Sequence, residues 1–195
     1  MFSGSKFAPP GPTRVSILTL ASRSPQRKAI LEQLGVSFRV VAPDVEELTE
    51  GAPSAVVVEN AVRKARAVEG ERVLGVDTAV VVDGRLYGKP ADQEEAGRSL
   101  ERLSGRWHEV WSGVVLRERR TERSASACTR VRFRALLPAD VEWYLATEEW
   151  RGRAGGYAIQ GRGAALVASI EGDFWNVVGL PVPQLLELTP DLLRP

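Results

Sequence analysis

The chain has 195 residues, of which 44% are apolar and 26% are charged, an ordinary composition for a soluble globular protein. Its 26 basic and 25 acidic side chains leave a net charge of +1, which argues against general electrostatic binding to nucleic acid or to an anionic membrane. One cysteine, Cys128, excludes an internal disulfide, and one histidine, His108, argues against a His/Cys zinc site. No apolar stretch approaches the roughly 20 residues that a membrane-spanning helix needs.

The N-terminal residues 1–12 are rich in Gly, Pro and Ser and lack the apolar centre of a signal peptide. We interpret them as a flexible tail on a cytoplasmic protein. For residues 13–195 we expect a single domain, and a division of that domain into two lobes around a cleft is the alternative.

The first predicted elements are strand, helix and strand. Residues 15–20 form a short apolar strand candidate. In the helix that follows, Ser24 is a good N-cap, Pro25 suits the first helical position, and Gly35 suits the stop. Residues 36–41 then predict a second strand.

A second helix is predicted over residues 54–69, where apolar residues recur at helical spacing. Residues 74–82 predict a buried strand, and the Asp-Gly pair at 83–84 is a strong two-residue hairpin signal. Residues 92–103 predict a helix that starts with a capping-box pattern and stops before Gly105.

Residues 107–116 and 128–136 are predicted to be paired strands, joined by a charged, solvated loop at 117–123. Arginines alternate along the second of these strands, as is typical of a solvent-facing side, and Cys128 is expected to be a small packing residue. The remaining predicted elements are a helix, a strand and a final helix, at residues 138–147, at 165–170 and after Pro181. Strands and helices alternate without regular βαβ units, so we expect an α/β or α+β fold with a mixed sheet flanked by helices.

Asp77 is a single carboxylate inside the apolar, β-branched run of residues 74–82. An ionised carboxylate in a buried strand is costly unless a cation or hydrogen-bond donors meet it. Together with Glu47 and Lys89, Asp77 is therefore a candidate for a metal-dependent site that takes a phosphorylated ligand. The alternative is a structural role, as a cap or as the partner of an arginine.

The junction between the first strand and the first helix is a candidate phosphate site. Helix N-termini bind anions through free N–H groups and the positive end of the helix dipole. Ser22 and Arg27 would add a hydroxyl donor and a bidentate cation suited to phosphate. The alternative is a well-capped surface helix with incidental arginines.

Glu47 and Asp77 could share a magnesium or manganese ion, because such cations take one or two carboxylates together with phosphate oxygens. Glu47 also lies among other acidic residues, and a solvated acidic loop is the alternative. Lysines are few, which draws attention to Lys64 on a predicted helix and to Lys89 after the hairpin. The segment around Lys89 is not a P-loop, because it is one residue short and Pro90 replaces the metal-binding Ser/Thr, so an exposed lysine is the alternative there.

The glycine-rich residues 155–161 predict a loop whose backbone can approach a ligand closely. Gln160 in this loop offers a donor and an acceptor for the edge of a base, and Tyr157 could stack on a ligand or pack. His108 has no evident serine or cysteine partner, so we expect a packed or surface histidine there.

Six short motifs follow one another along the chain. They are ASRSPQR at 21–27, GVDT at 75–78, GKP at 88–90, LSG at 103–105, AGGYAIQG at 154–161 and NVVGLP at 176–181. In this order and spacing they resemble the Maf family of nucleoside triphosphate pyrophosphatases, also described as septum-formation inhibitors. The resemblance extends from about Val15 to Leu188.

The resemblance implies an elongated α/β fold around a mixed sheet with a central nucleotide-binding cleft, often as a homodimer. It also implies hydrolysis of a nucleoside triphosphate to the monophosphate and pyrophosphate, dependent on a divalent metal such as Mg or Mn. By matching position, Asp77 would be the catalytic carboxylate and Glu47 its metal-associated partner. The residues that would contact the substrate are Ser22, Arg27, Lys64 and Lys89 at the phosphates and Gln160 in the nucleotide site.

Thr78, after the aspartate, and the Tyr-Ala-Ile-Gln of the late loop resemble the branch of the family that acts on dTTP and UTP rather than on 7-methyl-GTP. Gln26 stands where the family often has a first arginine, which weakens the expectation of one phosphate contact. Two other functions are kept as alternatives: a nucleotide-binding regulator of septum formation that acts without turnover, and a nucleic-acid-binding module, which the balanced charge disfavours.

Overall fold

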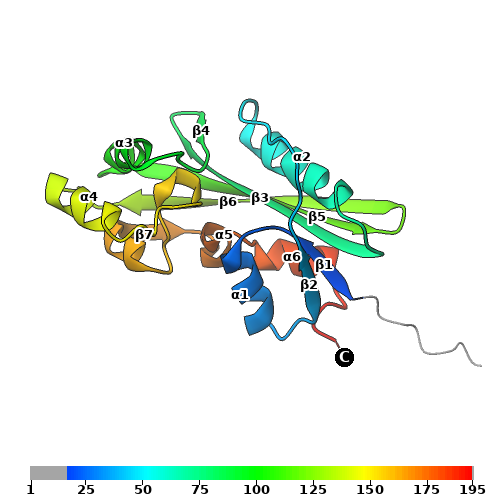
Figure 1. Ribbon diagram of the computed structural model, residues 1–195. Helices are drawn as coiled ribbons and strands as arrows, with labels where there is room; N and C mark the ends of the chain where they lie inside the picture. The colour runs from blue at the N-terminus through cyan, green and yellow to red at the C-terminus, as the bar shows by residue number, and fades with distance from the viewer. Residues whose placement is uncertain (1–16, 195) are drawn as a thin grey trace, which may run out of the picture.

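A mixed β-sheet forms the centre of the molecule (Figure 1). The computed structural model describes residues 17–194, so the tail expected at 1–12 lies outside the described residues. In the described part the sheet has seven strands in the order β2-β1-β3-β5-β6-β7, with β4 paired to β3. The strands are β1 (Leu18–Ala21), β2 (Phe38–Val41), β3 (Arg72–Val82), β4 (Arg85–Tyr87), β5 (Trp107–Glu118), β6 (Thr121–Phe133) and β7 (Val167–Glu171).

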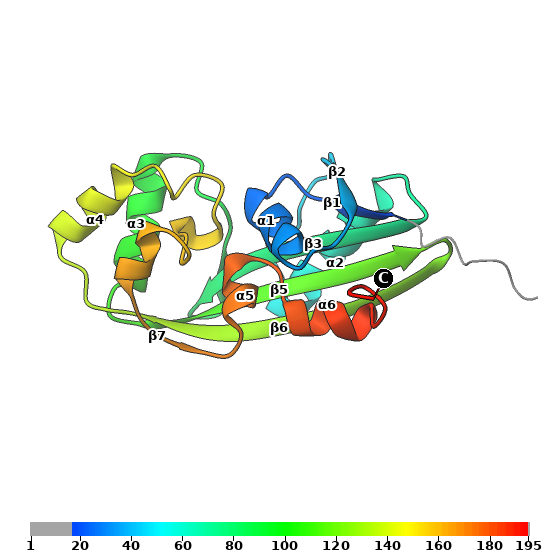
Figure 2. The same ribbon diagram turned by 90° about the horizontal axis from the view of Figure 1, so that it is seen from below.

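The strands β1, β2 and β3 pair in parallel, and the other strand pairs are antiparallel, which confirms the expected mixed sheet. Figure 2 shows α3 and α4 at one end of the molecule, α1 near the middle and β1 and β2 beyond it, with the long strands β5 and β6 extending toward the other end. The helices are α1 (Pro25–Gln33), α2 (Pro53–Arg66), α3 (Gln93–Leu103), α4 (Pro138–Leu145), α5 (Phe174–Val178) and α6 (Val182–Leu188). Within residues 17–194, no helix is both long and apolar enough to cross a membrane.

Alternate residues of β3 face opposite sides of the sheet. Leu74 and Val76 are buried in a cluster with residues of α1 and α6, whereas Val73 packs with alanines of α2. On the α2 side the backbones come into direct contact, because a Cβ at Gly75 would lie 2.1 Å from the Ala61 carbonyl oxygen. A Cβ at Gly113 of β5 would lie 2.3 Å from a carbonyl of the same helix. Glycine at these two positions therefore sets how closely α2 approaches the sheet.

Several local predictions are confirmed. The Ser24 hydroxyl caps α1 by accepting from the Arg27 backbone N–H, Pro25 is the first helical residue, and Gly35 has a φ of 69° just after the helix. The turn at residues 83–84 joins β3 to β4 with a positive φ at both residues, as a tight hairpin turn requires.

Other predictions were wrong. The charged stretch 117–123 is not a loop, because β5 and β6 stay paired until only two residues separate the strands. Charged side chains of this stretch form ion pairs, such as Glu122 of β6 with Arg66 of α2. Cys128 is exposed, because the alternation of β6 turns Ala127 and Thr129 inward and places the thiol on the outer side. The helix α5 was not predicted from the sequence.

Candidate active site

A cleft opens beside the middle of β3, between the residues that pair with β1 and the residues that pair with β4. β1 pairs with β3 as far as Gly75, and β4 begins to pair at Val80, so residues 76–79 have no strand on that side within the described chain. A cavity of about 370 Å³ lies here. All the site residues predicted from the sequence line it: Ser22, Arg27, Glu47, Lys64, Asp77, Thr78, Lys89 and Gln160.

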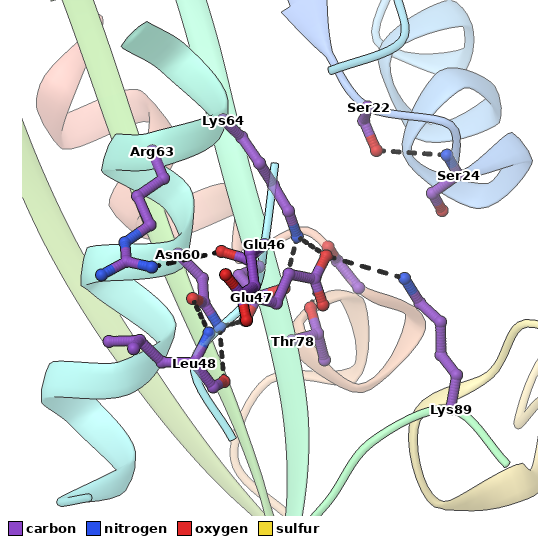
Figure 3. A network of polar contacts seen from close by, with 12 residues as sticks. Ser22, Ser24, Glu46, Glu47, Leu48, Asn60, Arg63, Lys64, Thr78 and Lys89 are labelled. Atoms are coloured by element: carbon purple, nitrogen blue, oxygen red, sulfur yellow. Dashed lines mark hydrogen bonds and ion pairs between the residues drawn. The ribbon is translucent and has the colours of Figure 1, made fainter. Parts of the chain in front are cut away.

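Lys64 joins the two predicted carboxylates. Its Nζ lies 2.6 Å from Asp77 Oδ1 and 2.6 Å from Glu47 Oε1, and Figure 3 shows the Lys64 side chain reaching Glu47. Lys64 and Asp77 are buried, whereas the Glu47 side chain is 38% exposed. A buried carboxylate needs such a partner, because desolvation of an unpaired charge is costly.

The helix α2 presents two donors to Asp77. Lys64 and Asn60 are four residues apart and therefore lie on one face of the helix. The Asn60 Nδ2 donates to Asp77 Oδ2 at 3.0 Å, while Lys64 contacts the other carboxylate oxygen. Asn60 was not predicted as a site residue from the sequence, although its spacing from Lys64 is a signal that could have identified it.

Arg27 forms the opposite wall of the site. Its guanidinium donates to Ser22 Oγ at 3.0 Å, to Thr78 Oγ1 at 3.0 Å and to the Gly179 carbonyl at 2.8 Å. Burial lowers the pKa of Arg27, and the charges of Asp77 and Glu47 oppose that shift. The network fixes a cation beside the first turn of α1, whose N-terminus favours anions.

Ser22 holds a hydroxyl toward the same region. Its Oγ accepts from the Ser24 backbone N–H at 3.1 Å and from Arg27, so both lone pairs of the oxygen are used. The hydroxyl proton is then left to donate to a ligand. Thr78 is placed differently, because its Oγ1 accepts from Arg27 and lies 2.9 Å from Ser112 Oγ.

Lys89 approaches from the loop after β4. Its Nζ lies 4.0 Å from Glu47 Oε1, and Figure 3 shows it extending toward the group formed by Glu47 and Lys64. Desolvation lowers the pKa of Lys89; Glu47 opposes the shift, and the positive charges of Lys64 and Arg27 add to it. The lysine side chain is 55% exposed, so it can move to meet a ligand in the cleft.

The glycine-rich loop supplies the far wall. Gln160 is exposed at the cleft, while Tyr157, Ala158 and Ile159 are buried beneath it. The Tyr157 hydroxyl lies 2.8 Å from His108 Nε2, and burial lowers the pKa of that histidine to about 4. His108 is thus a packed histidine, as expected, and Tyr157 packs in the core.

Arg153 is a second residue of the site that was not predicted from the sequence. It lines the cavity near Gln160, and its Nε is buried with no hydrogen-bond partner in the described chain. Burial lowers its pKa, with Tyr144 and Glu149 opposing the shift. No motif pointed to this arginine, because it precedes the glycine-rich loop in a stretch with no marked pattern.

The cleft offers few protein ligands for a metal ion. Within residues 17–194, no three His, Cys, Asp or Glu side chains lie together in a way that could hold one. Glu47 and Asp77 are two hard oxygen donors that converge on the same point, now contacted by Lys64. Such a pair suits a cation that takes its other ligands from water and phosphate oxygens.

Comparison with known proteins identifies the relatives of this chain. The family model for Maf-like proteins matches residues 17–192. A dTTP/UTP pyrophosphatase of Gloeobacter violaceus is 46% identical over 183 residues, which cover 91% of this chain and 96% of that protein. Proteins of the same name from Symbiobacterium thermophilum and Thermus thermophilus are 48% and 46% identical, over 88% of this chain and 91% and 92% of their own lengths. The chain therefore belongs to the Maf family.

Proposed function

We propose that this protein hydrolyses dTTP and UTP to the nucleoside monophosphate and pyrophosphate, with the help of a divalent metal ion. The main support is the composition of one cleft, where the carboxylate of Asp77 is surrounded by the cations Arg27, Lys64 and Lys89. Such a mixture suits a polyphosphate together with the water that attacks it. The names of the relatives support the choice of substrate.

The triphosphate would lie between α1 and the loop that bears Lys89. Ser22, Arg27 and the positive end of the α1 dipole would bind phosphate oxygens on one side. Lys89, whose side chain is 55% exposed, would meet the phosphates from the other side. The pyrimidine base would then lie toward Gln160, whose amide can pair with the edge of the base.

In the reaction Asp77 would orient a water molecule and accept its proton. The water oxygen attacks the α-phosphorus, a new P–O bond forms, and the bond between the α-phosphorus and the bridging oxygen breaks to release pyrophosphate. Arg27, Lys64 and Lys89 would stabilise the negative charge that builds up on the phosphate oxygens. Positioning and charge neutralisation are the main contributions that a protein makes to this chemistry.

Glu47 and Asp77 would hold the metal ion, Mg or Mn, because they are two hard oxygen donors that lie close together in the cleft, each within 2.6 Å of Lys64 Nζ. When bound, the ion would neutralise phosphate charge and complete its coordination with substrate oxygens. The resemblance to the Maf family further supports a cytoplasmic homodimer with no nucleic-acid or membrane partner.

The experiment is a measurement of pyrophosphate release from dTTP, UTP, CTP, dATP and GTP, with Mg²⁺, with Mn²⁺ or with EDTA. The proposal predicts release from dTTP and UTP that EDTA abolishes. Tight binding of these nucleotides with no product from a folded protein would instead favour a regulator that acts without turnover. Equal release in EDTA would contradict the metal requirement alone.

A further inference from the structure

Asn60 makes three hydrogen bonds with its one amide group. Its Nδ2 donates to Asp77 Oδ2 at 3.0 Å and to the Leu48 carbonyl at 3.0 Å, while its Oδ1 accepts from the Leu48 N–H at 2.7 Å (Figure 3). The side chain is buried, with 2% of the residue exposed, and it does not line the cleft. Asn60 therefore contacts the proposed catalytic carboxylate from behind, out of reach of a ligand.

The other partner of Asn60 belongs to the segment that bears Glu47. Residues 42–52 form neither helix nor strand, and part of this segment lines the cleft. Asn60 hydrogen-bonds to both the N–H and the C=O of Leu48, as the backbone of a neighbouring strand would. It therefore fixes the position of the residue that follows Glu47. A second contact from α2 comes from Arg63, which donates to the Glu46 carbonyl at 3.2 Å but does not contact Asp77.

We propose that Asn60 is a positioning residue that couples Glu47 to Asp77, so that both carboxylates are held in the geometry the reaction needs. This inference rests on the proposed function. Lys64 donates to one oxygen of Asp77 and Asn60 to the other, so the two donors of α2 together fix the plane of the carboxylate. The same amide sets the position of the backbone beside Glu47.

Only an amide fits these partners. An aspartate in this position would accept from the Leu48 N–H but would place a second carboxylate against Asp77. A leucine of similar volume would leave the Leu48 N–H and C=O and one oxygen of Asp77 without their partner, which is costly for buried groups. The position requires a side chain that donates two hydrogen bonds and accepts one, which explains why asparagine is found on this face of α2.

The test compares Asn60→Leu and Asn60→Asp with Arg63→Met, a matched change that removes the other α2 anchor of the same segment. Asn60→Leu is expected to lower kcat for UTP roughly 10- to 100-fold, the usual cost of losing an outer partner of a site group, with KM changed much less. Arg63→Met is expected to keep kcat within about threefold, since surface contacts contribute little. In the Asp77→Asn background, Asn60→Leu should cost clearly less than in the wild type, because the part of its effect that acts through Asp77 is already lost.

Hydrogen exchange of the Leu48 amide gives a readout that does not depend on turnover. Asn60→Leu should abolish the protection of this amide, whereas Asn60→Asp should keep the protection and still lower kcat.

If the leucine variant does not fold, the kcat of the aspartate variant alone tests whether Asn60 positions Asp77. An unchanged kcat in either folded variant, or an equal loss with and without Asp77, would overturn the inference. A wild-type protein that protects Leu48 but releases no pyrophosphate would refute the proposed function and leave only the anchoring of the segment.

Discussion

Lys64 Nζ lies 2.6 Å from Asp77 Oδ1, and both side chains are buried at the back of the cleft. The two residues come from α2 and β3, whose backbones touch at Gly75. The ion pair therefore depends on a close packing of helix and strand as well as on the two side chains. This packing links the stability of the fold to the chemistry proposed for the site.

Asp77→Asn is expected to lower kcat by ~10²–10⁴, the usual cost of losing a positioned base. The variant should fold, since Glu47 still pairs with Lys64. Asp83→Asn is the control, because Asp83 lies in the turn at the end of the same strand and pairs only with the exposed Arg106 among the described residues. Steady-state kinetics with UTP measure both. Turnover in a folded Asp77→Asn variant that matches the control would exclude the role as base.

Lys64 and Lys89 are expected to respond differently to substitution. Lys89→Ala should weaken transition-state stabilisation by about 3 kcal/mol, a loss of roughly 10²-fold in kcat/KM comparable to the loss of an oxyanion donor, with Tm unchanged because the side chain is half exposed. Lys64→Met should lower the free energy of unfolding by about 3–5 kcal/mol, because it leaves a buried carboxylate without its cation. Kinetics and urea unfolding of each variant check both statements. A Lys64→Met variant with wild-type stability would contradict the claim that Lys64 stabilises the fold. A Lys89→Ala variant with wild-type kcat/KM would place Lys89 outside the site.

Gly75→Ala is expected to damage both stability and activity. The new Cβ would overlap the Ala61 carbonyl of α2, so the helix must shift, and overpacking of this kind costs about 1–3 kcal/mol. The same shift would move Lys64 away from Asp77 and lower kcat. Gly97→Ala in α3 is the control, since its Cβ would have only an ordinary contact at 3.4 Å. The idea fails if Gly75→Ala retains wild-type Tm and kcat.

His108 should make the fold sensitive to acid. Burial lowers its pKa from 6.5 to about 4, so between these values the unfolded chain binds a proton that the folded protein does not. The stability due to neutral His108 is complete above pH 6.5 and is lost as the pH falls from 6.5 to 4, and the total loss is about 3 kcal/mol. Urea unfolding of wild type and His108→Gln from pH 7.5 to 4 measures this. Parallel pH profiles for the two proteins would rule out the histidine as the cause.

Much of the fold could be predicted from local patterns. The cap at Ser24, the turn at residues 83–84 and the buried strand around Asp77 depend on neighbours in the chain, and the structure confirms them. The site residues could be predicted as one set because the resemblance to the Maf family assigned them together, and the structure brings them to one cleft. The roles assigned to them remain predictions.

What could not be predicted depends on contacts between distant segments. Asn60 appeared only as a polar residue on a helix, and its importance comes from Leu48 and Asp77, which the fold brings to it. The charged residues at 117–123 suggested a loop because some of their ion-pair partners lie in distant elements, as Arg66 of α2 does for Glu122 and Arg72 of β3 does for Glu118. The exposure of Cys128 follows from which face of β6 the helices cover, and a single strand does not reveal that.

The most direct test of the central claim is hydrolysis of UTP in H₂¹⁸O, followed by mass spectrometry of both products. Attack of an Asp77-activated water on the α-phosphorus predicts one ¹⁸O atom in UMP and none in the pyrophosphate. Label in the pyrophosphate, or the formation of UDP and labelled phosphate, would contradict the account.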